Sequence, residues 1–539
     1  MAALQRSSSH SPLSEGGQRI EGKDAQRMNI MAARIITESI KTTLGPRGMD
    51  KMLVDSLGDV VVTNDGATIL REMNLDHPVG KMMVEVARTQ EAVVGDGTTT
   101  AVVIAGELLK NAQSLLDENI HPTIIARGYR MAAKKALEIL DNVAITISYD
   151  EEIFQKIALT TITGKGVDKA KEHLSVLVVK AILAVTDEEE GKISVKTEDI
   201  KLEKLEGGGI ENTEFVKGII MDKEKVHPSM PQKVNDARIF LTNFPLELRG
   251  KELDGRIRIT DPNQMKAFTD EEMGSMKRMI EIIKNSGATV MLSQKGIDEL
   301  GQYYLANAGI LAVRRVKKGD IEKLAKATGA SIVSNIEELG EQDLGYAGLV
   351  EQVKIDEHMM IQVTECLQPK AVSILIRGAT SHVTEEVERA IEDCLGAVPA
   401  AMEDKKIVAG GGAAEIEMAE RLRAYARTIG GKEQLAIEAF ADSLEAIPRA
   451  LAENAGLDSI DMLVKLKSAY RRKGSSNTGL DIFDGRIKDM YQEGIIEPAR
   501  VKKQSIISAS EVAVIILRID DIIGASQLGK QPPPRPEGM

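Results

Sequence analysis

Apolar residues in the first part of the chain, up to about Val143, recur at the spacing of amphipathic helices. Met28, Met31 and Ile35 form one stripe, and Gly45-Pro46 would end that helix. Two further helices are marked by Val79, Met82 and Val86, and by Val102, Ala105, Leu109, Ala112 and Leu116. The pattern predicts a strongly helical region.

A different pattern fills the middle of the chain, from about Phe215 to Gln368, where short β-like runs alternate with helical segments. These runs are residues 237–241, 289–292, 310–313 and 331–333. The alternation predicts an α/β domain. Nearer the start, residues 52–54 and 60–63 flank Gly58-Asp59 and predict a β-hairpin.

Long helical patterns return after about Glu433, for example over residues 433–453. Gly207-Gly208-Gly209 and Gly378 lie between the regions, and such glycines serve either as hinges or as plain turns. The 539 residues exceed what a single core accommodates. The sequence therefore predicts a multidomain protein in which an α/β domain is inserted into a split, mostly helical domain.

Composition narrows the setting and the partners. Cys366 and Cys394 are too few for a disulfide framework, which favours a reducing, cytoplasmic location. The net charge of -13 argues against a general nucleic-acid binder, and no apolar run is long enough to cross a bilayer. The Ser-rich start has no apolar core typical of a secretory signal; it and the Pro-rich end are expected to be flexible.

The most informative stretch for chemistry is Gly95-Asp96-Gly97-Thr98-Thr99-Thr100, which opens the third helix. A helix start offers unpaired N–H groups and partial positive charge, which suit phosphate. Glycines let the backbone approach closely, threonine hydroxyls donate to phosphate oxygens, and Asp96 is placed to hold Mg²⁺. A plain N-cap followed by threonines is the alternative, but the full hexapeptide at a helix start favours phosphate.

Two other stretches are ambiguous when taken alone. Thr43-Leu44-Gly45-Pro46-Arg47-Gly48 could be a helix C-cap and a turn, and Asn64-Asp65-Gly66 is usually a turn. Neither Thr163-Gly164-Lys165-Gly166 nor Gly410-Gly411-Gly412 belongs to a G-x-x-x-x-G-K-[ST] motif, so the usual P-loop fold is disfavoured. The histidines show no metal-binding spacing, and Asp393 alone would be a solvated acid on a helix.

Taken together, these motifs resemble those of the group II chaperonins, the archaeal thermosome and the eukaryotic cytosolic chaperonin, with the archaeal branch closer. The matching segments follow the family order from about Glu21 to Ile523. They are TTLGPRGMDKMLVD, NDGATIL, GDGTTTAVV, TGKG, RITDP, QKGID, AVRRVKK, DLGYAGLVE, AGGGAAE and EPARVKKQS.

The resemblance implies an ATP-hydrolysing chaperone subunit, in a double ring of eight subunits per ring, homomeric or mixed, that encloses non-native client proteins. The implied domains are an equatorial ATPase domain (21–147 and 405–525), an intermediate hinge domain (148–214 and 369–404) and an apical client-binding domain (215–368). A helical lid is implied at about 243–284. The leader (1–20) and the tail (526–539) lie outside these domains.

The resemblance also implies roles for single residues. Asp96 is the implied Mg²⁺ ligand, Asp65 an acid near the γ-phosphate, and Asp393 the group that orients the attacking water. The implied contacts to ATP or ADP are Thr43, Leu44, Gly45, Pro46, Gly97, Thr98, Thr99, Thr100, Thr163, Gly164, Lys165, Gly411, Glu497 and Lys502. Among them Lys165 resembles the γ-phosphate sensor, while Gly411, Glu497 and Lys502 resemble ribose and adenine contacts.

The chain departs from the family pattern in three places. Glu91-Ala92-Val93-Val94 replaces the usual acidic pair before the GDGTTT motif, Pro399 lies in a segment expected to be helical, and the end of the chain lacks Gly-Gly-Met repeats. Two other classes of function are the alternatives: a non-catalytic scaffold that has lost turnover, and a metabolic kinase with an unrelated phosphate loop. Asp65, Asp96, Lys165 and Asp393 are all present, which disfavours the scaffold.

Overall fold

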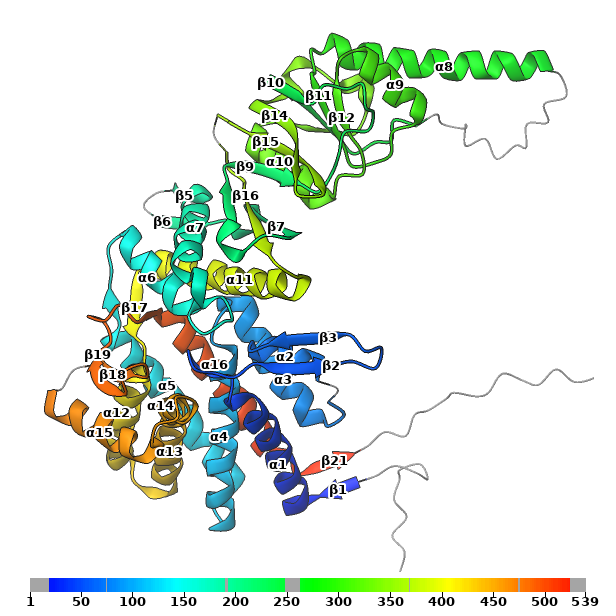
Figure 1. Ribbon diagram of the computed structural model, residues 1–539. Coiled ribbons are helices and arrows are strands. Elements are labelled where there is room, and N and C mark those ends of the chain that lie inside the picture. Colours follow the sequence, from blue (N-terminus) through cyan, green and yellow to red (C-terminus); the bar gives the residue numbers. More distant parts are fainter. Residues whose placement is uncertain are drawn as a thin grey trace, which may run out of the picture. The chain divides into compact units, whose positions relative to one another are not determined.

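The computed structural model describes residues 19–73, 75–189, 192–247, 262–367, 369–473 and 476–523 (Figure 1). These residues form two compact units. Unit 1 contains the described residues up to Ile145, Val408–Ile495 and the described residues from Ala499 on. Unit 2 contains Thr146–Ile407 and Ile496–Pro498. The chain passes between the units at the short strands β4 (Ile145–Thr146), β17 (Lys406–Ala409) and β20 (Ile496–Pro498).

Unit 1 is built mainly from helices around α4, which packs against α1, α3, α13 and α16. Its helices are α1 (Gly22–Lys41), α2 (Gly66–Glu72), α3 (Pro78–Val94), α4 (Thr98–Asp117), α5 (Pro122–Val143), α12 (Ala413–Ile429), α13 (Gly431–Leu444), α14 (Ala446–Asn454), α15 (Ser459–Lys473) and α16 (Ala499–Leu517). Val102, Ala105, Leu109 and Ala112 are buried in the core, as their spacing predicted.

Short antiparallel strand pairs complete unit 1. They are β1 (Arg19–Glu21) with β21 (Asp521–Ile523), β2 (Lys51–Val54) with β3 (Val60–Thr63), and β18 (Thr478–Asp481) with β19 (Arg486–Asp489). The hairpin predicted around Gly58-Asp59 is confirmed, with Val54 opposite Val60.

Two sequence predictions for unit 1 were wrong in detail. Met28, Met31 and Ile35 do lie on a helix, but they are exposed, and Ile30, Ile36 and Ile40 enter the core instead. Methionine and isoleucine side chains lie on more than one face of α1. Periodicity alone therefore did not show which face of the helix is buried in the core. The single helix expected over residues 433–453 is split at Glu445 into α13 and α14.

Unit 2 contains the helices α6 (Glu151–Ile162), α7 (Lys171–Ala184), α8 (Pro262–Asn285), α9 (Glu299–Asn307), α10 (Lys318–Thr328) and α11 (Ser381–Asp404). Helix α11 continues through Pro399, so the proline does not end it. Its strands are β5 (Thr186–Glu189), β6 (Lys192–Val195), β7 (Ile200–Glu206), β8 (Glu214–Val216), β9 (Gly218–Met221), β10 (Lys233–Thr242), β11 (Val290–Ser293), β12 (Leu311–Val313), β13 (Ile332–Val333), β14 (Gly345–Ile355), β15 (His358–Thr364) and β16 (Val372–Gly378).

The largest sheet of unit 2 has the strand order β12-β11-β10-β14-β15-β9, with β13 also paired to β10. The four short runs predicted in the middle of the chain became β10, β11, β12 and β13, which run parallel to one another where they pair. A second sheet has the strand order β7-β16-β8. Gly207-Gly208-Gly209 comes directly after β7 in the chain. There the Arg377 guanidinium donates to the Gly207 carbonyl oxygen over 2.8 Å and pairs with Asp356.

Cys366 and Cys394 are both buried, and neither forms a disulfide. Burial raises the pKa of the Cys366 thiol to about 11. None of the helices in the described part of the chain combines the length and apolar character needed to cross a membrane.

Candidate nucleotide site

The turn that opens α4 has the backbone shape that its glycines allow. Gly95 and Gly97 have φ angles of 72° and 81°, a region that residues with a Cβ rarely adopt. Between them, Asp96 accepts a hydrogen bond at Oδ1 from the Gly97 N–H over 2.7 Å. The buried residues Thr98, Thr99 and Thr100 follow as the first turn of α4. A helix start of this kind favours an anion.

The start of α2 lies directly against the start of α4. Asp65 caps α2 by accepting from the Thr68 N–H over 2.8 Å, and its Oδ1 accepts from the Thr98 hydroxyl over 3.1 Å. A Cβ on Gly66 would lie 2.6 Å from Thr99 Oγ1, so only glycine permits this approach. The structure therefore brings together two motifs, Asn64-Asp65-Gly66 and Gly95–Thr100, that sequence reasoning could only consider one at a time.

The turn Thr43-Leu44-Gly45-Pro46 is held by α14. Asn454 Nδ2 donates to the Lys41 and Leu44 carbonyl oxygens over 3.0 and 2.8 Å. Gly45 has a φ of 82°, and a Cβ there would lie 2.3 Å from Leu451 Cδ2. These contacts fix the backbone of the turn.

Gly411 and Gly412 form the turn before α12, with φ angles of 61° and 76°. The Leu480 N–H donates to the Gly411 carbonyl oxygen over 2.8 Å, and a Cβ on Gly411 would lie 2.8 Å from the Leu480 oxygen. The turn therefore lies against β18 with no room for a side chain. The Arg47 guanidinium, next to Pro46, stands 5.7 Å from the centre of the Phe483 ring in the β18–β19 turn.

Lys502 is less open to a ligand than the sequence suggested. Its side chain on α16 is almost fully buried, and its Nζ lies 2.9 Å from Oε1 of Glu415 in the first turn of α12. This buried ion pair joins α16 to the helix that follows the Gly411 turn. Glu497 lies on β20 in unit 2 and is partly buried.

In unit 2, the structure pairs two residues for which the sequence implied separate tasks. Lys165 follows the end of α6, and its ammonium forms an ion pair with the Asp393 carboxylate on α11. Both side chains are more than four-fifths buried. The Thr163 hydroxyl donates to the Leu159 carbonyl oxygen over 2.6 Å, and the Gly164 N–H donates to Asp168 Oδ1 over 3.1 Å.

Sequence reasoning missed Gln90, on α3 beside the Gly95–Gly97 turn, and noted its neighbour Glu91 only as a departure from the family pattern. Gln90 is completely buried, and Nε2 donates to the Asp96 carbonyl oxygen over 2.8 Å. The pKa of Glu91 is raised, first by burial and then by the negative charge of Asp65. One signal was available: Gln90 interrupts an otherwise apolar buried stripe of α3.

The whole-chain comparisons agree with the motifs. The model of the TCP-1/cpn60 chaperonin family matches residues 36–527. The chain belongs to the TCP-1/cpn60 chaperonin family. Thermosome subunits are its relatives: those of Methanopyrus kandleri and Pyrococcus horikoshii are 59% and 58% identical to it, each over 96% of this chain and 95% and 94% of their own. Thermosome subunit alpha of Archaeoglobus fulgidus is 55% identical over 97% of this chain and 96% of its own.

A solved structure is also similar to this chaperonin chain. It is the open-state monomer of a group II chaperonin from Methanococcoides burtonii, 45% identical, with a TM-score of 0.59. The match covers 79% of this chain and all of the other. The resemblance to group II chaperonins, including the closeness to archaeal thermosomes, is therefore confirmed.

The residues of unit 1 suit Mg²⁺ that arrives with a nucleotide. Asp65, Asp96 and the Thr98 hydroxyl offer hard oxygen atoms, which Mg²⁺ prefers, at a helix start that favours phosphate. Among the described residues, no three His, Cys, Asp or Glu side chains gather as a metal cage.

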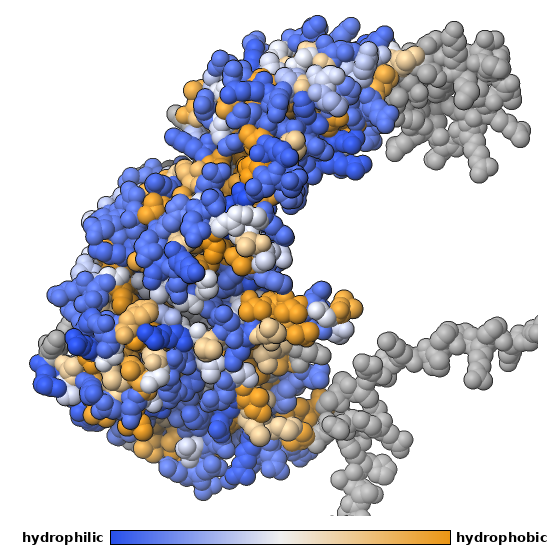
Figure 2. Space-filling view, in the orientation of Figure 1, coloured by the Kyte–Doolittle hydropathy of each residue, from blue (hydrophilic) through white to orange (hydrophobic). Residues whose placement is uncertain are grey.

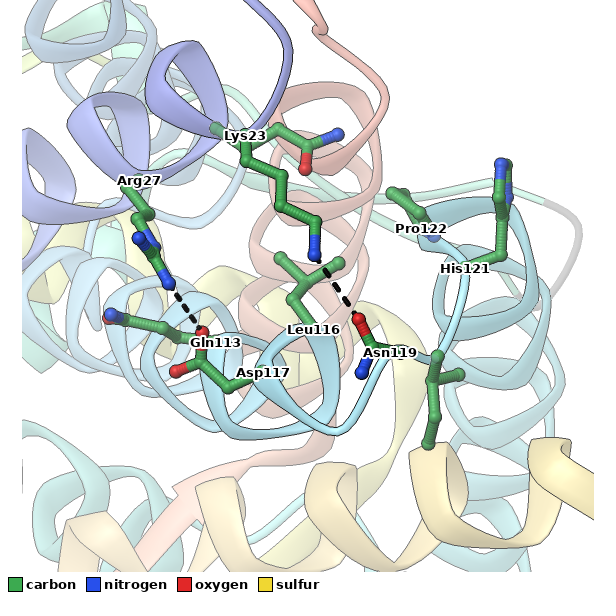
Figure 3. Close-up of a pocket in the computed structure, with 10 residues that line it drawn as sticks. Lys23, Arg27, Gln113, Leu116, Asp117, Asn119, His121 and Pro122 are labelled. Carbon is green, nitrogen blue, oxygen red and sulfur yellow. Dashed lines mark hydrogen bonds and ion pairs between the residues drawn. The ribbon is translucent and has the colours of Figure 1, made fainter.

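A separate pocket of about 180 Å³ lies among α1, the end of α4 and the start of α5 (Figure 3). Arg27 forms an ion pair with Asp117 over 3.1 Å, and the Lys23 ammonium donates a hydrogen bond to Asn119 Oδ1 over 3.2 Å. None of the nucleotide contacts implied by the sequence lines this pocket. We assign it no part in the nucleotide site.

Proposed function

We propose that this chain is an ATP-hydrolysing chaperonin subunit that captures non-native protein and encloses it within a double ring. The observation that carries the proposal is the contact between the starts of α2 and α4, where Asp65, Asp96 and Thr98 gather. Two carboxylates at a phosphate-binding helix start suit hydrolysis of Mg²⁺-bound ATP. The membership of the chaperonin family connects that chemistry to protein folding.

Each part of the nucleotide has proposed contacts. The N–H groups and hydroxyls of Gly97, Thr98, Thr99 and Thr100 would hold phosphate oxygens, with Thr43, Leu44, Gly45 and Pro46 beside them. Gly411, with Glu497 and Lys502, would lie on the ribose and adenine side. Asp96 would hold Mg²⁺, which would neutralise charge on the phosphates. Asp65 would orient groups near the γ-phosphate while it continues to cap α2.

Lys165 and Asp393 would couple hydrolysis to a conformational change. In the pair seen here, each neutralises the other. A γ-phosphate competes for the lysine, because an ammonium binds phosphate oxygens as well as carboxylate. If Lys165 exchanged the Asp393 carboxylate for the γ-phosphate, with Thr163 and Gly164 beside it, Asp393 would be released to orient the attacking water. Because these residues belong to unit 2 and Asp96 belongs to unit 1, hydrolysis in this proposal depends on closure.

The proposed partners are further chaperonin subunits, eight in each ring, either identical or mixed. Apolar side chains at and before the β2–β3 hairpin are open to solvent: Met49, Met52, Val54 and Leu57. Figure 2 shows apolar residues over this hairpin. Exposed apolar groups of this kind suit contacts with another subunit. We propose a cytoplasmic location, with no nucleic-acid or membrane partner.

Client capture is proposed on α9 and enclosure by the lid at about 243–284. Tyr303 on α9 is 52% exposed, so it offers apolar area to an unfolded chain. The lid prediction falls partly outside the described residues, since 248–261 are not among them. Met276 and Ile280 on α8 are buried in the core of unit 2, so they are not free for lid contacts.

The test uses the purified full-length chain and its Asp96→Ala variant. We expect Mg²⁺-dependent phosphate release from the parent and at least about a hundredfold less from the variant, because the proposed metal ligand is lost. Negative-stain microscopy should show double rings for both. A parent chain that forms rings but never releases phosphate would indicate a scaffold, and a small active particle would indicate a kinase.

A further inference from the structure

Gln90 is a buried polar residue whose role the nucleotide motifs do not explain. It lies on the covered face of α3, in line with Val79, Met83, Val86 and Val94, and it is 0% exposed. A side chain of that size on an apolar stripe would normally be leucine or methionine. An amide at such a place needs partners for its polar atoms.

The amide nitrogen of Gln90 has two acceptors from different parts of the chain. Nε2 donates to the carbonyl oxygen of Asp96 over 2.8 Å and to that of Val501, on α16, over 3.1 Å. Because both partners are carbonyl oxygens, the atom that faces them must be the nitrogen. One side chain thus ties the Gly95–Gly97 turn to α16.

The other amide atom of Gln90 lacks the hydrogen-bond partner that a buried oxygen needs. Oε1 of Gln90 is buried and has no hydrogen-bond partner among the described residues. A buried oxygen without a partner is destabilising, and an apolar side chain would avoid it. An apolar side chain would, however, remove one donor from the Asp96 carbonyl oxygen and one from that of Val501, which also accepts from the Ser505 hydroxyl over 3.0 Å.

The packing around the turn leaves it few other positions. A Cβ on Gly97 would lie 2.8 Å from Val501 Cγ1 and 3.0 Å from Gln90 Nε2. The turn is therefore packed against Gln90, which donates to its Asp96 carbonyl oxygen, and against Val501, the other acceptor of Gln90. The Asp96 carboxylate of this turn accepts at Oδ1 from the Gly97 N–H.

We propose that Gln90 is a positioning residue for nucleotide hydrolysis. It ties the backbone of Asp96 to α16, and this presents the Asp96 carboxylate to the magnesium ion of bound nucleotide. The inference rests on the proposed function. It deepens that function by assigning the support of the metal ligand to a residue outside the phosphate motif. Groups that orient a metal ligand in this way typically change metal affinity or activity by about 10- to 100-fold when lost.

The test compares Gln90→Leu with a matched control, Asn111→Leu. Asn111 is an amide on α4 that donates to the Ala439 carbonyl oxygen over 3.3 Å and to the Ser443 hydroxyl over 2.8 Å, so each change removes two hydrogen bonds. Hydrogen exchange of the ligand-free proteins is measured at residues 91–97. The Mg²⁺ concentration for half-maximal ATP hydrolysis is measured with KM and kcat.

We expect Gln90→Leu to speed exchange at Gly95 and Gly97 and to raise the Mg²⁺ requirement by about tenfold or more. Asn111→Leu should change neither, although both substitutions lower Tm. Equal effects in the two variants, or no effect of Gln90→Leu on either measurement, would overturn the proposal. If the parent hydrolyses no ATP, the proposed function fails, while the exchange measurement still decides whether Gln90 holds the turn.

Should Gln90→Leu not fold, Gln90→Met replaces it, since methionine fits irregular space and also lacks the donor. Faster exchange at the turn in Gln90→Met would support the proposal. Exchange as slow as in the parent would overturn it.

Discussion

At the scale of single residues, the polar groups of the candidate site mostly serve two purposes at once. Asp65 caps α2 and also accepts from Thr98, and Asp96 holds the Gly97 N–H with a carboxylate oxygen. Lys165 and Asp393 neutralise each other in unit 2. These bonds orient the side chains, which reduces the ordering that catalysis requires.

Substitution of Lys165 and of Asp393 should give different defects. Asp393→Ala should bind ATP normally but hydrolyse it at least about a hundredfold more slowly, since the group proposed to orient water is lost. Lys165→Ala should bind nucleotide yet fail to couple binding to closure. ATP affinity, turnover and protease protection of the lid are measured on both. Parental turnover in Asp393→Ala would contradict its assignment.

The raised pKa of Glu91 gives a pH dependence with a definite sign. Burial and the charge of Asp65 make the folded state hold this proton more tightly than the unfolded state. The unfolding free energy contributed by this group therefore falls as pH rises from the unfolded value, about 4.5, through the raised folded pKa.

Glu91→Gln removes this titration, so the variant should gain Tm relative to the parent at neutral pH and lose that advantage near pH 4. Thermal unfolding between these pH values checks the prediction. Glu85→Gln is the control, since Glu85 lies on the same helix with an exposed side chain. A pH-independent difference between Glu91→Gln and the parent would count against the mechanism.

At the scale of elements, α16 connects the two turns proposed to hold the nucleotide. Val501 accepts from Gln90 beside the Asp96 turn, and the next residue, Lys502, pairs with Glu415 just after the Gly411 turn. On the other side, Asn454 of α14 holds the turn at Gly45. Helices that are distant in sequence thus set the distances between these three turns. The turns are too short to maintain those distances by themselves.

The Glu415–Lys502 pair should show strong coupling in a double-mutant cycle. Lys502→Met leaves the buried Glu415 carboxylate without its ammonium partner and should lower the unfolding free energy by about 3–5 kcal/mol, and Glu415→Leu, which removes the other side of the ion pair, should also lower it. The double variant should lose far less than the sum. Urea unfolding of the three variants measures the coupling. The exposed pair Lys465–Asp461 on α15 is the control, with an expected coupling below about 0.5 kcal/mol.

At the scale of the whole molecule, two compact units divide the proposed tasks. Unit 1 contains the helix starts proposed to bind phosphate, and unit 2 contains Lys165, Asp393 and the proposed client surface. The finer division of unit 2 into a hinge domain and an apical domain stays a prediction. If the assignment holds, substitutions on α9 should affect client capture and leave ATP hydrolysis unchanged.

Tyr303 and Tyr304 allow a matched test of that separation. Tyr303 is exposed, whereas Tyr304 packs against the core, with the Lys277 ammonium 5.6 Å from its ring centre. Tyr303→Ser should weaken capture of a denatured client without change in Tm or ATPase rate. Tyr304→Ser should mainly lower Tm. Unchanged capture in Tyr303→Ser would place the client surface elsewhere.

The sequence by itself determined the family, the α/β character of the middle segment and most elements. The ordered motifs were specific, and the spacing along α4 and the alternation in the middle reflect local geometry that a short window contains. It also placed Asp96 and Thr98 at a helix start, because glycines and threonines at that point leave few other backbone shapes.

Only the tertiary structure decided which of these residues meet. That α2 and α4 touch at Gly66 and Thr99, that Lys502 is committed to Glu415, and that Lys165 faces Asp393 all depend on segments far apart in the chain. The same holds for Met28, Met31 and Ile35, whose spacing gave the helix but not its covered face. Gln90 makes the reason plain: its partners are backbone carbonyl oxygens, one of them more than 400 residues away, and carbonyl groups leave no trace in the sequence.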